Sequence, residues 1–127
     1  MKPLPPYARF LGVRTELSDA DEWLFVMPFG ERVTGRPGYL HGGAIAGLLE
    51  FAAFGALYEA LGDERPRLKP VNVAVQYMRG GINHDTFAAA RVTRLGRRVA
   101  NIEAHAWQLD RAKPIAAAQM NVLIRRD

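Results

Sequence analysis

Residues 38–60 read GYLHGGAIAGLLEFAAFGALYEA and contain the longest apolar run of the chain. From Gly42 to about Leu61 this run has no proline and is rich in alanine and leucine, which predicts one long helix. Apolar side chains would lie on nearly every side of the helix, so it must be buried on most sides. Its glycines and alanines would let a covering sheet approach closely. The stretch therefore predicts a central helix around which the rest of the chain is built.

Strand patterns flank this helix on both sides. Residues 11–19 and 22–30 precede it and are rich in β-forming side chains, whereas residues 30–38 and 62–70 are predicted to be loops. Four further strands are predicted after the helix, in segments 71–78, 86–96, 97–110 and 113–124. Alternation in two of them places side chains on shared faces: Val71, Val73, Val75 and Tyr77 on one, and Ala100, Ile102, Ala104 and Ala106 on another, opposite Asn101, Glu103 and His105. Successive strands without intervening helices favour an antiparallel sheet. We therefore expect an α+β fold in which a curved antiparallel sheet wraps one long helix.

The composition limits the classes of site that the chain can carry. It has 127 residues, of which 49% are hydrophobic, so we expect a single domain over residues 1–127. The absence of cysteine excludes a disulfide framework, a thiolate nucleophile and a cysteine-based zinc site. The three histidines, His41, His84 and His105, lack ligand-like spacing, so no metal site is expected.

The same features bear on location and macromolecular partners. The first residues, MKPLPPYARFLG, contain three prolines and no long apolar core, unlike a secretory signal. The long apolar run is interrupted by Glu50 and is judged shorter than the ~20 residues that span a bilayer, so no membrane partner is expected. The net charge of +4 comes from arginines without interleaved stacking aromatics, so no nucleic-acid partner is expected. A cytoplasmic location follows as the expectation.

Glu50 is the one residue between Gly43 and Tyr58 that is charged at neutral pH. A carboxylate on a buried helix is costly unless it is hydrogen-bonded or paired. One interpretation is a structural glutamate that a backbone amide or an arginine satisfies. The other is a catalytic base or nucleophile with a raised pKa, because active sites are where buried carboxylates with shifted pKa values are commonly found.

The start of the helix favours the catalytic interpretation. In the sequence His41-Gly42-Gly43, the first amides of the helix lack intrahelical partners, and glycine lets a ligand approach them closely. The positive end of the helix dipole also stabilises a developing oxyanion, as acyl transfer requires. However, Gly42 and Glu50 are eight residues apart, which is ~12 Å along a helix. If both act on one carbonyl, the carboxylate must come from a second subunit, which also predicts a dimer whose open strand edges are covered.

These motifs resemble those of the hotdog-fold acyl-CoA thioesterases, in particular the phenylacetate-degradation type of the 4-hydroxybenzoyl-CoA thioesterase superfamily. The resemblance extends over YARFLG, PGYLHGGAIAGLLEFAAFGAL, VNVAVQYMRG and RVTRLGRRVANIEAHAW. Its most specific part is His-Gly-Gly followed by an acidic residue nine positions after the histidine, here His41 and Glu50. The resemblance implies a hotdog fold, homodimers that pair into tetramers in many members, and hydrolysis of an acyl-CoA thioester. CoA is then part of the substrate, and no separate cofactor is implied.

The resemblance also implies roles for individual residues. The Gly42 amide would polarise the thioester carbonyl, Glu50 of the partner chain would act as base or nucleophile, and His41 would orient the loop. Substrate-binding positions are implied beside the reacting group and at the phosphates of CoA, namely Gly43, Phe54, Arg79, Arg97 and Arg98. The acyl group is not identified. Five apolar side chains are candidates either for its pocket or for the core: Trp23, Phe51, Phe54, Tyr58 and Met78.

The chain departs from the family pattern at two positions. Many members have Asn or Gln six residues before the histidine, where this chain has Gly35, and Ser or Thr where it has Pro70. Thr34 and Asn72 are polar residues that lie nearby in the sequence, but the sequence does not assign either of them the missing role. These losses keep open a second function, a non-catalytic protein that binds acyl-CoA or a fatty ligand. A hotdog dehydratase or hydratase is a third class, but His41 falls in the thioesterase motif.

Overall fold

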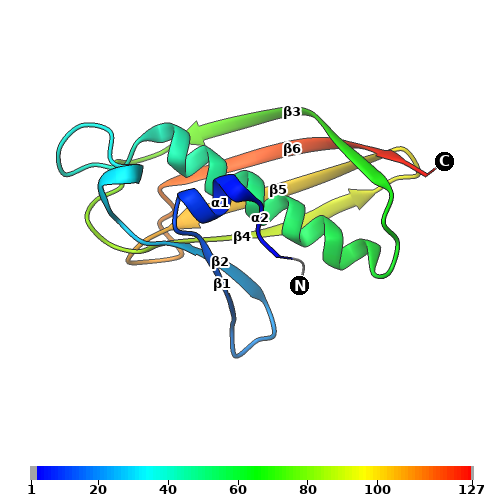
Figure 1. Ribbon diagram of the computed structural model, residues 1–127, viewed down its shortest axis with the longest axis horizontal. Coiled ribbons are helices and arrows are strands. Elements are labelled where there is room, and N and C mark those ends of the chain that lie inside the picture. The colour runs from blue at the N-terminus through cyan, green and yellow to red at the C-terminus, as the bar shows by residue number, and fades with distance from the viewer. Residues whose placement is uncertain (1–2, 127) are drawn as a thin grey trace.

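The computed structural model describes residues 3–126 and shows a six-stranded sheet wrapped around one long helix (Figure 1). The chain forms the elements α1 (Pro6–Phe10), β1 (Arg14–Leu17), β2 (Trp23–Met27), η1 (Glu31–Val33), α2 (Gly42–Leu61), β3 (Arg67–Tyr77), β4 (Thr86–Leu95), β5 (Val99–Trp107) and β6 (Ala116–Arg125). The predicted order of two strands, one long helix and four strands is confirmed, and this arrangement is the hotdog fold. The short helices α1 and η1 were not predicted.

The strands form one antiparallel sheet in the order β1-β2-β4-β5-β6-β3. The prediction that residues 62–70 are a loop was wrong at its end, because β3 begins at Arg67. The pairing of β3 with β6 shifts register between Pro70 and Asn72, so Val71 is an extra residue in this ladder. Proline is tolerated here because β3 is an edge strand, where a missing N–H breaks no ladder on the open side.

The helix α2 begins and ends at residues suited to those positions. His41 is its N-cap, with an extended backbone and a side chain that accepts a hydrogen bond from the Gly43 amide. Gly62 follows its last turn with a positive φ of 63°, which a residue with a side chain rarely adopts. The helix has 20 residues, so it is long enough to cross a bilayer, contrary to the sequence-based estimate. By length and composition alone this is weak evidence, because a core helix of this kind passes the same test.

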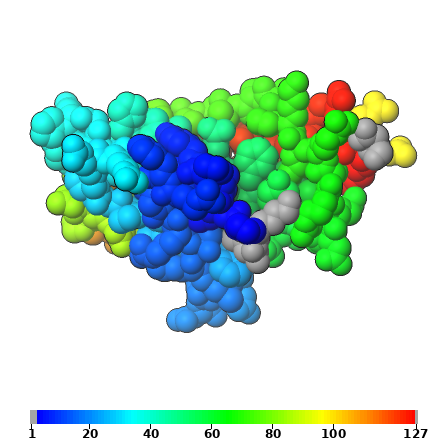
Figure 2. Space-filling model, in the orientation of Figure 1, coloured from blue at the N-terminus to red at the C-terminus, as the bar shows by residue number. Residues whose placement is uncertain are grey.

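The core lies between α2 and the sheet. Leu48, Leu49 and Leu57 of α2 are fully buried. The shared face predicted for residues 100, 102, 104 and 106 of β5 is confirmed, and it points into the core, since all four residues are buried. Small side chains on this face allow the helix and sheet to approach closely. In the space-filling view, α1 covers part of α2, and the β1–β2 hairpin extends beyond the body of the molecule (Figure 2).

The strand β3 forms one edge of the sheet and is exposed over most of its length. The exposed fractions of Val71 and Val73 are 62% and 38%. A long edge strand with exposed β-branched side chains is a surface on which another strand can pair.

Candidate active site

The first turn of α2 is held in place by His41. Its backbone amide donates to the Val33 carbonyl oxygen at 2.8 Å, and its Nδ1 accepts from the Gly43 amide at 2.8 Å. Its carbonyl oxygen accepts from Ala44 and Ile45. These bonds use one ring nitrogen of His41 to position the glycines, in line with the orienting role that the family resemblance implies.

Within the described residues, the carbonyl group of Gly42 is hydrogen-bonded, whereas its amide is not. The Gly42 carbonyl oxygen accepts a hydrogen bond from the Tyr77 hydroxyl at 2.9 Å. Within residues 3–126, no acceptor is bonded to the Gly42 amide. The Gly43 amide is already used by His41. Gly42 therefore supplies the N–H that remains available at the positive end of the helix.

Sequence analysis assigned no role to Tyr77, which lies at the end of β3. A Cβ atom added at Gly42 would lie 3.4 Å from the Tyr77 ring, so ring and glycine are in close contact. The signal in the sequence was the alternation of 71–78, which placed Tyr77 on the face shared with Val73 and Val75. That face points toward α2 only because β3 pairs with β6.

Glu50 lies on α2, two turns after Gly42, and is half-buried. No hydrogen bond or ion pair within the described residues uses its carboxylate. The interpretation of Glu50 as a structural glutamate satisfied by an amide or an arginine therefore has no support within one chain. The ~12 Å helical rise between Gly42 and Glu50 also prevents both from reaching one carbonyl.

The positions that depart from the family pattern have local explanations. A Cβ atom at Gly35 would lie 3.1 Å from the His41 Cα, so a side chain there would press on the backbone that caps α2. The Thr34 hydroxyl donates to the Gly30 carbonyl oxygen at 2.6 Å. Asn72 accepts from the Asn121 amide at 2.7 Å, in the sheet. The Thr34 hydroxyl proton and the Asn72 Oδ1 are therefore already bonded to partners within the chain.

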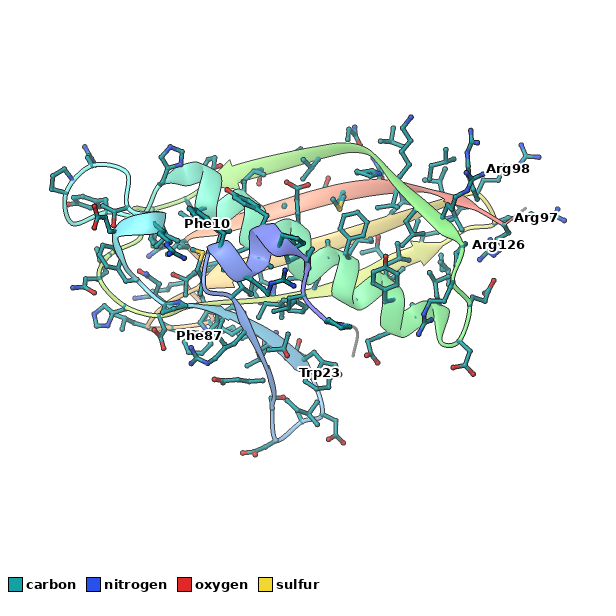
Figure 3. All side chains as sticks on the ribbon, in the orientation of Figure 1. Phe10, Trp23, Phe87, Arg97, Arg98 and Arg126 are labelled. Carbon is teal, nitrogen blue, oxygen red and sulfur yellow. The ribbon has the colours of Figure 1, made fainter. Side chains whose placement is uncertain are left out.

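The predicted phosphate-binding arginines lie at opposite ends of the folded molecule. Arg79 follows β3, whose end contacts the first turn of α2 through Tyr77. Arg97 and Arg98 lie in the β4–β5 turn at the opposite end, next to Arg126 (Figure 3). Because α2 rises ~30 Å over its 20 residues, one chain does not bring Arg97 and Arg98 to its own Gly42 amide.

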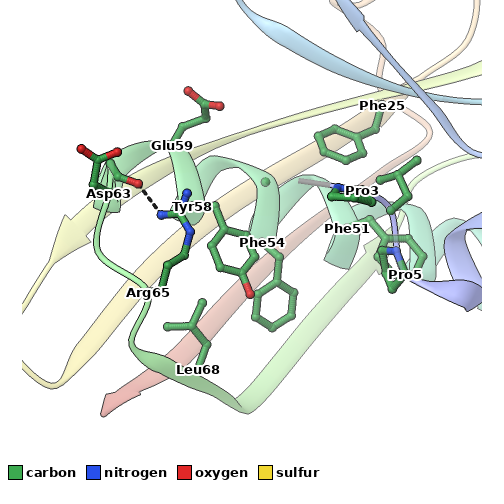
Figure 4. Close-up of a pocket in the computed structure, with 13 residues that line it drawn as sticks. Pro3, Pro5, Phe25, Phe51, Phe54, Tyr58, Glu59, Asp63, Arg65 and Leu68 are labelled. Atoms are coloured by element: carbon green, nitrogen blue, oxygen red, sulfur yellow. Dashed lines mark hydrogen bonds between the residues drawn. The ribbon is translucent and has the colours of Figure 1, made fainter. Parts of the chain in front are cut away.

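An open cavity of about 850 Å³ adjoins the second half of α2 (Figure 4). Of the apolar candidates from the sequence, Phe51, Phe54 and Tyr58 line it. Trp23 and Met78 lie elsewhere, at the start of β2 and just after β3. Phe51 and Phe54, one and four residues after Glu50, line the inner end of this cavity, whereas Glu50 itself does not line it.

A separate charged cluster lies on the sheet face that points away from α2. Arg111 donates two hydrogen bonds to the Glu22 carboxylate, at 2.7 and 2.9 Å, and its Nε donates to His105 Nε2 at 3.1 Å. Its guanidinium also stacks 4.4 Å from the centre of the Trp107 ring. These bonds from Arg111 lower the pKa of Glu22, and bonding to Glu22 raises the pKa of Arg111. Burial, followed by the charge of Arg111, lowers the pKa of His105.

Sequence analysis interpreted His105 only as a residue on a strand face. Its neighbours come from the β1–β2 turn and from the loop after β5, so no local pattern identified this cluster. Through Arg111, the cluster connects the β1–β2 hairpin to β5. It lies across the sheet from Glu50 and Gly42.

Solved structures with this fold include proteins from several bacteria. A Bacillus halodurans protein bound to CoA is 17% identical, with a TM-score of 0.87, and the alignment covers all of this chain and 83% of that one. A mutant thioesterase from Pseudomonas aeruginosa is 26% identical, with a TM-score of 0.79 and coverage of 94% and 85%. A phenylacetic acid degradation-related protein from Ralstonia eutropha JMP134 is 20% identical, with a TM-score of 0.80 and coverage of 96% and 92%.

No curated protein matches this sequence. The sequence profile of the thioesterase superfamily matches residues 37–115. This range includes the His41-Gly42-Gly43 motif, Glu50, Tyr77 and the arginine-containing turn after β4. Because this match spans more than half of the sequence, the chain belongs to the thioesterase superfamily.

Proposed function

We propose that the protein hydrolyses acyl-CoA thioesters at sites formed between two copies of the chain. The observation that carries the proposal is the unbonded Gly42 amide at the start of a helix whose one central carboxylate, Glu50, is equally unpartnered within residues 3–126. An amide donor aimed at a carbonyl oxygen, with a carboxylate on its other side, is the arrangement that acyl transfer needs.

In the proposed reaction, the Gly42 amide binds the thioester oxygen and stabilises the negative charge that develops there. Glu50 of the other chain removes a proton from water, whose oxygen forms a bond to the carbonyl carbon. The carbon–sulfur bond then breaks, its electron pair leaves with sulfur, and the proton passes to the CoA thiolate. Direct attack by Glu50 through an anhydride is the alternative route to the same acid and CoA.

A two-fold dimer can bring Gly42 of one chain and Glu50 of the other to the same carbonyl group, which the ~12 Å rise within one helix prevents. If Gly42 of each chain faces Glu50 of the other, the two α2 helices run antiparallel and cross near Ala46. The exposed edge strand β3, with Val71 and Val73, offers the pairing surface for such a dimer. The second half of the partner helix then extends beyond Gly42. The partner's basic turn, with its Arg97 and Arg98, comes to the same side as the Gly42 amide, where the CoA phosphates are proposed to bind.

The experiment compares wild type with Glu50→Gln on a panel of acyl- and aryl-CoA thioesters, with the released thiol as the readout. We expect kcat to fall by roughly 10²–10⁴-fold, the contribution of a general base. Glu31→Gln, an exposed carboxylate in η1, is the matched control and should retain full turnover. Equal turnover by wild type and Glu50→Gln would refute the mechanism.

The second candidate is a protein that binds acyl-CoA without hydrolysing it. Gly35 and Pro70 favour it, because the side chains that assist water in relatives are missing, and the Thr34 hydroxyl proton and Asn72 Oδ1 nearby are bonded to other groups. Saturable binding of a CoA ester, with no thiol released from any member of the panel, is the result that would support it.

A further inference from the structure

The cavity beside α2 is an elongated groove that follows the helix. Its helical lining comes from Phe51, Phe54, Tyr58 and Gly62, spaced three or four residues apart and thus on one face. From Phe51 to Gly62 this face rises about 16 Å along the helix axis. We call this cavity the α2 groove. Its inner end, at Phe51 and Phe54, lies within one helical turn of Glu50, and Glu59, Asp63 and Arg65 line its far end.

The opposite wall of the α2 groove also carries apolar side chains. Pro5 comes from the segment before α1 and Phe25 from β2, whereas Leu68 of β3 lies near Arg65 (Figure 4). Leu4, next to Pro5, also lines this wall. Charged side chains line only the far end, where Glu59, Asp63 and Arg65 lie. An occupant of the inner half therefore meets aromatic and aliphatic surface and few polar groups.

Gly55 sets the width of the α2 groove. A Cβ atom at this position would lie 2.5 Å from the Phe25 Cζ, so any side chain would push the ring aside. Phe25 is 3% exposed and packs in the core, with its ring against the backbone of α2. The pair forms a smooth floor across which an alkyl chain can lie. Neither residue was identified in the sequence as relevant to the substrate.

We propose that the α2 groove holds the acyl group of the substrate, and that this group is a linear alkyl chain of medium to long length. The proposal rests on the proposed thioesterase function, since the inner end of the groove lies within one helical turn of Glu50, beside which the reacting carbonyl would lie. A single aromatic ring would fill only the first helical turn of a groove that extends for three. Burial of each further methylene along the groove improves binding.

The pantetheine arm of CoA is the competing occupant, because it is also long and flexible. Its two amides would lie against the apolar inner half of the groove, where the lining offers them no side-chain partners. Burying an amide without a hydrogen bond is costly, which favours the alkyl chain. The two occupants differ in one measurable respect. Only an alkyl occupant makes the effect of blocking the groove depend on acyl length.

The test blocks the groove at Glu59, ~13 Å along the helix from Glu50. Glu59→Trp is compared with Ala60→Trp, which places the same indole side chain at the next exposed position, outside the groove lining. Substrates are butanoyl-, octanoyl-, dodecanoyl- and benzoyl-CoA. In wild type, kcat/KM should rise with chain length by up to about fourfold per buried methylene. Glu59→Trp should lose this gain for dodecanoyl-CoA but retain butanoyl-CoA hydrolysis, whereas Ala60→Trp should behave as wild type.

Two results would overturn the proposal. The first is a wild-type preference for benzoyl-CoA over every alkyl ester. The second is an equal loss for all esters in Glu59→Trp, which would assign the groove to pantetheine.

If no ester is hydrolysed, the proposed function fails, and the groove is judged by binding. The probe is then the non-hydrolysable dodecyl thioether of CoA, compared with free CoA by calorimetry. Tighter binding of the thioether that is lost in Glu59→Trp and kept in Ala60→Trp would support the alkyl groove. Equal affinity for thioether and free CoA in wild type would overturn it.

Discussion

The Tyr77 hydroxyl donates to the Gly42 carbonyl oxygen at 2.9 Å and so connects the end of β3 to the first turn of α2. The Gly42 carbonyl and the Gly43 amide belong to one peptide unit, and that amide also donates to His41. Two side chains thus fix the orientation of the backbone next to the proposed oxyanion donor. Such preorganisation is what gives an oxyanion donor its effect.

Tyr77→Phe should lower kcat by roughly 3- to 10-fold while changing the free energy of unfolding by only about 1 kcal/mol, the net value of one hydrogen bond. The ring that packs on Gly42 remains, so the loss reports the hydroxyl alone. Tyr39→Phe, a tyrosine close to Gly80, serves as the control and should be neutral. A wild-type kcat in Tyr77→Phe would show that this bond does not orient Gly42.

His41 is predicted to act as a cap rather than as a general base. His41→Ala should lower the free energy of unfolding by about 0.5–2 kcal/mol, and His41→Asn should restore most of it, because asparagine also accepts from the amides of the first turn. Chemical denaturation and thiol release would be measured together. If His41→Asn is stable but has lost turnover completely, the ring itself takes part in the reaction.

The shared site is tested by complementation. Gly42→Pro removes the proposed donor, and proline is tolerated at this first helical position because the preceding residue, His41, is already extended. Glu50→Gln removes the carboxylate. Each variant alone should be nearly inactive.

Co-refolding equal amounts of Gly42→Pro and Glu50→Gln should restore about a quarter of wild-type activity, since half of the dimers are mixed and each has one intact site. Gly42→Pro mixed with itself is the control. Failure of the mixture to gain activity, despite mixed dimers visible by native mass spectrometry, would refute a site shared between Gly42 and Glu50 of two chains.

The stability of the fold should depend on pH through His105. The fold lowers the pKa of His105, so the folded chain favours the neutral imidazole that accepts from Arg111. Below the ordinary histidine pKa of about 6.5, the unfolded chain binds more protons than the folded one. This contribution to stability is therefore complete above that pH and decreases as the pH falls through the lowered pKa.

Glu22, whose pKa is also lowered, adds a further loss of stability at more acidic pH. Thermal unfolding from pH 8 to pH 5 should show a smaller decrease in Tm for His105→Gln than for wild type. His84→Gln, in the loop before β4, should follow wild type. Parallel curves for all three proteins would assign the pH dependence to other groups.

Sequence periodicity was sufficient for the helix and most of the strands. The apolar run with glycine at its start placed α2, and the alternation in β5 identified its buried face, because both patterns follow from local backbone geometry. Periodicity failed at the start of β3, because residues 67–70 contain two charged side chains and a proline and were predicted to be part of a loop. Those residues pair with the end of β6, and such a distant partner leaves no local pattern.

By itself, the sequence determined the class of the fold and the candidate catalytic groups on the central helix. His41, Gly42, Gly43 and Glu50 stand at fixed offsets, and helical rise alone showed that Gly42 and Glu50 cannot share a substrate within one chain. Tertiary structure decided which groups surround them. Tyr77 reaches Gly42, Phe25 reaches Gly55, and Arg111 joins Glu22 to His105, each across more than five residues of sequence. These contacts depend on strand order and register, which long-range packing selects and no short segment specifies.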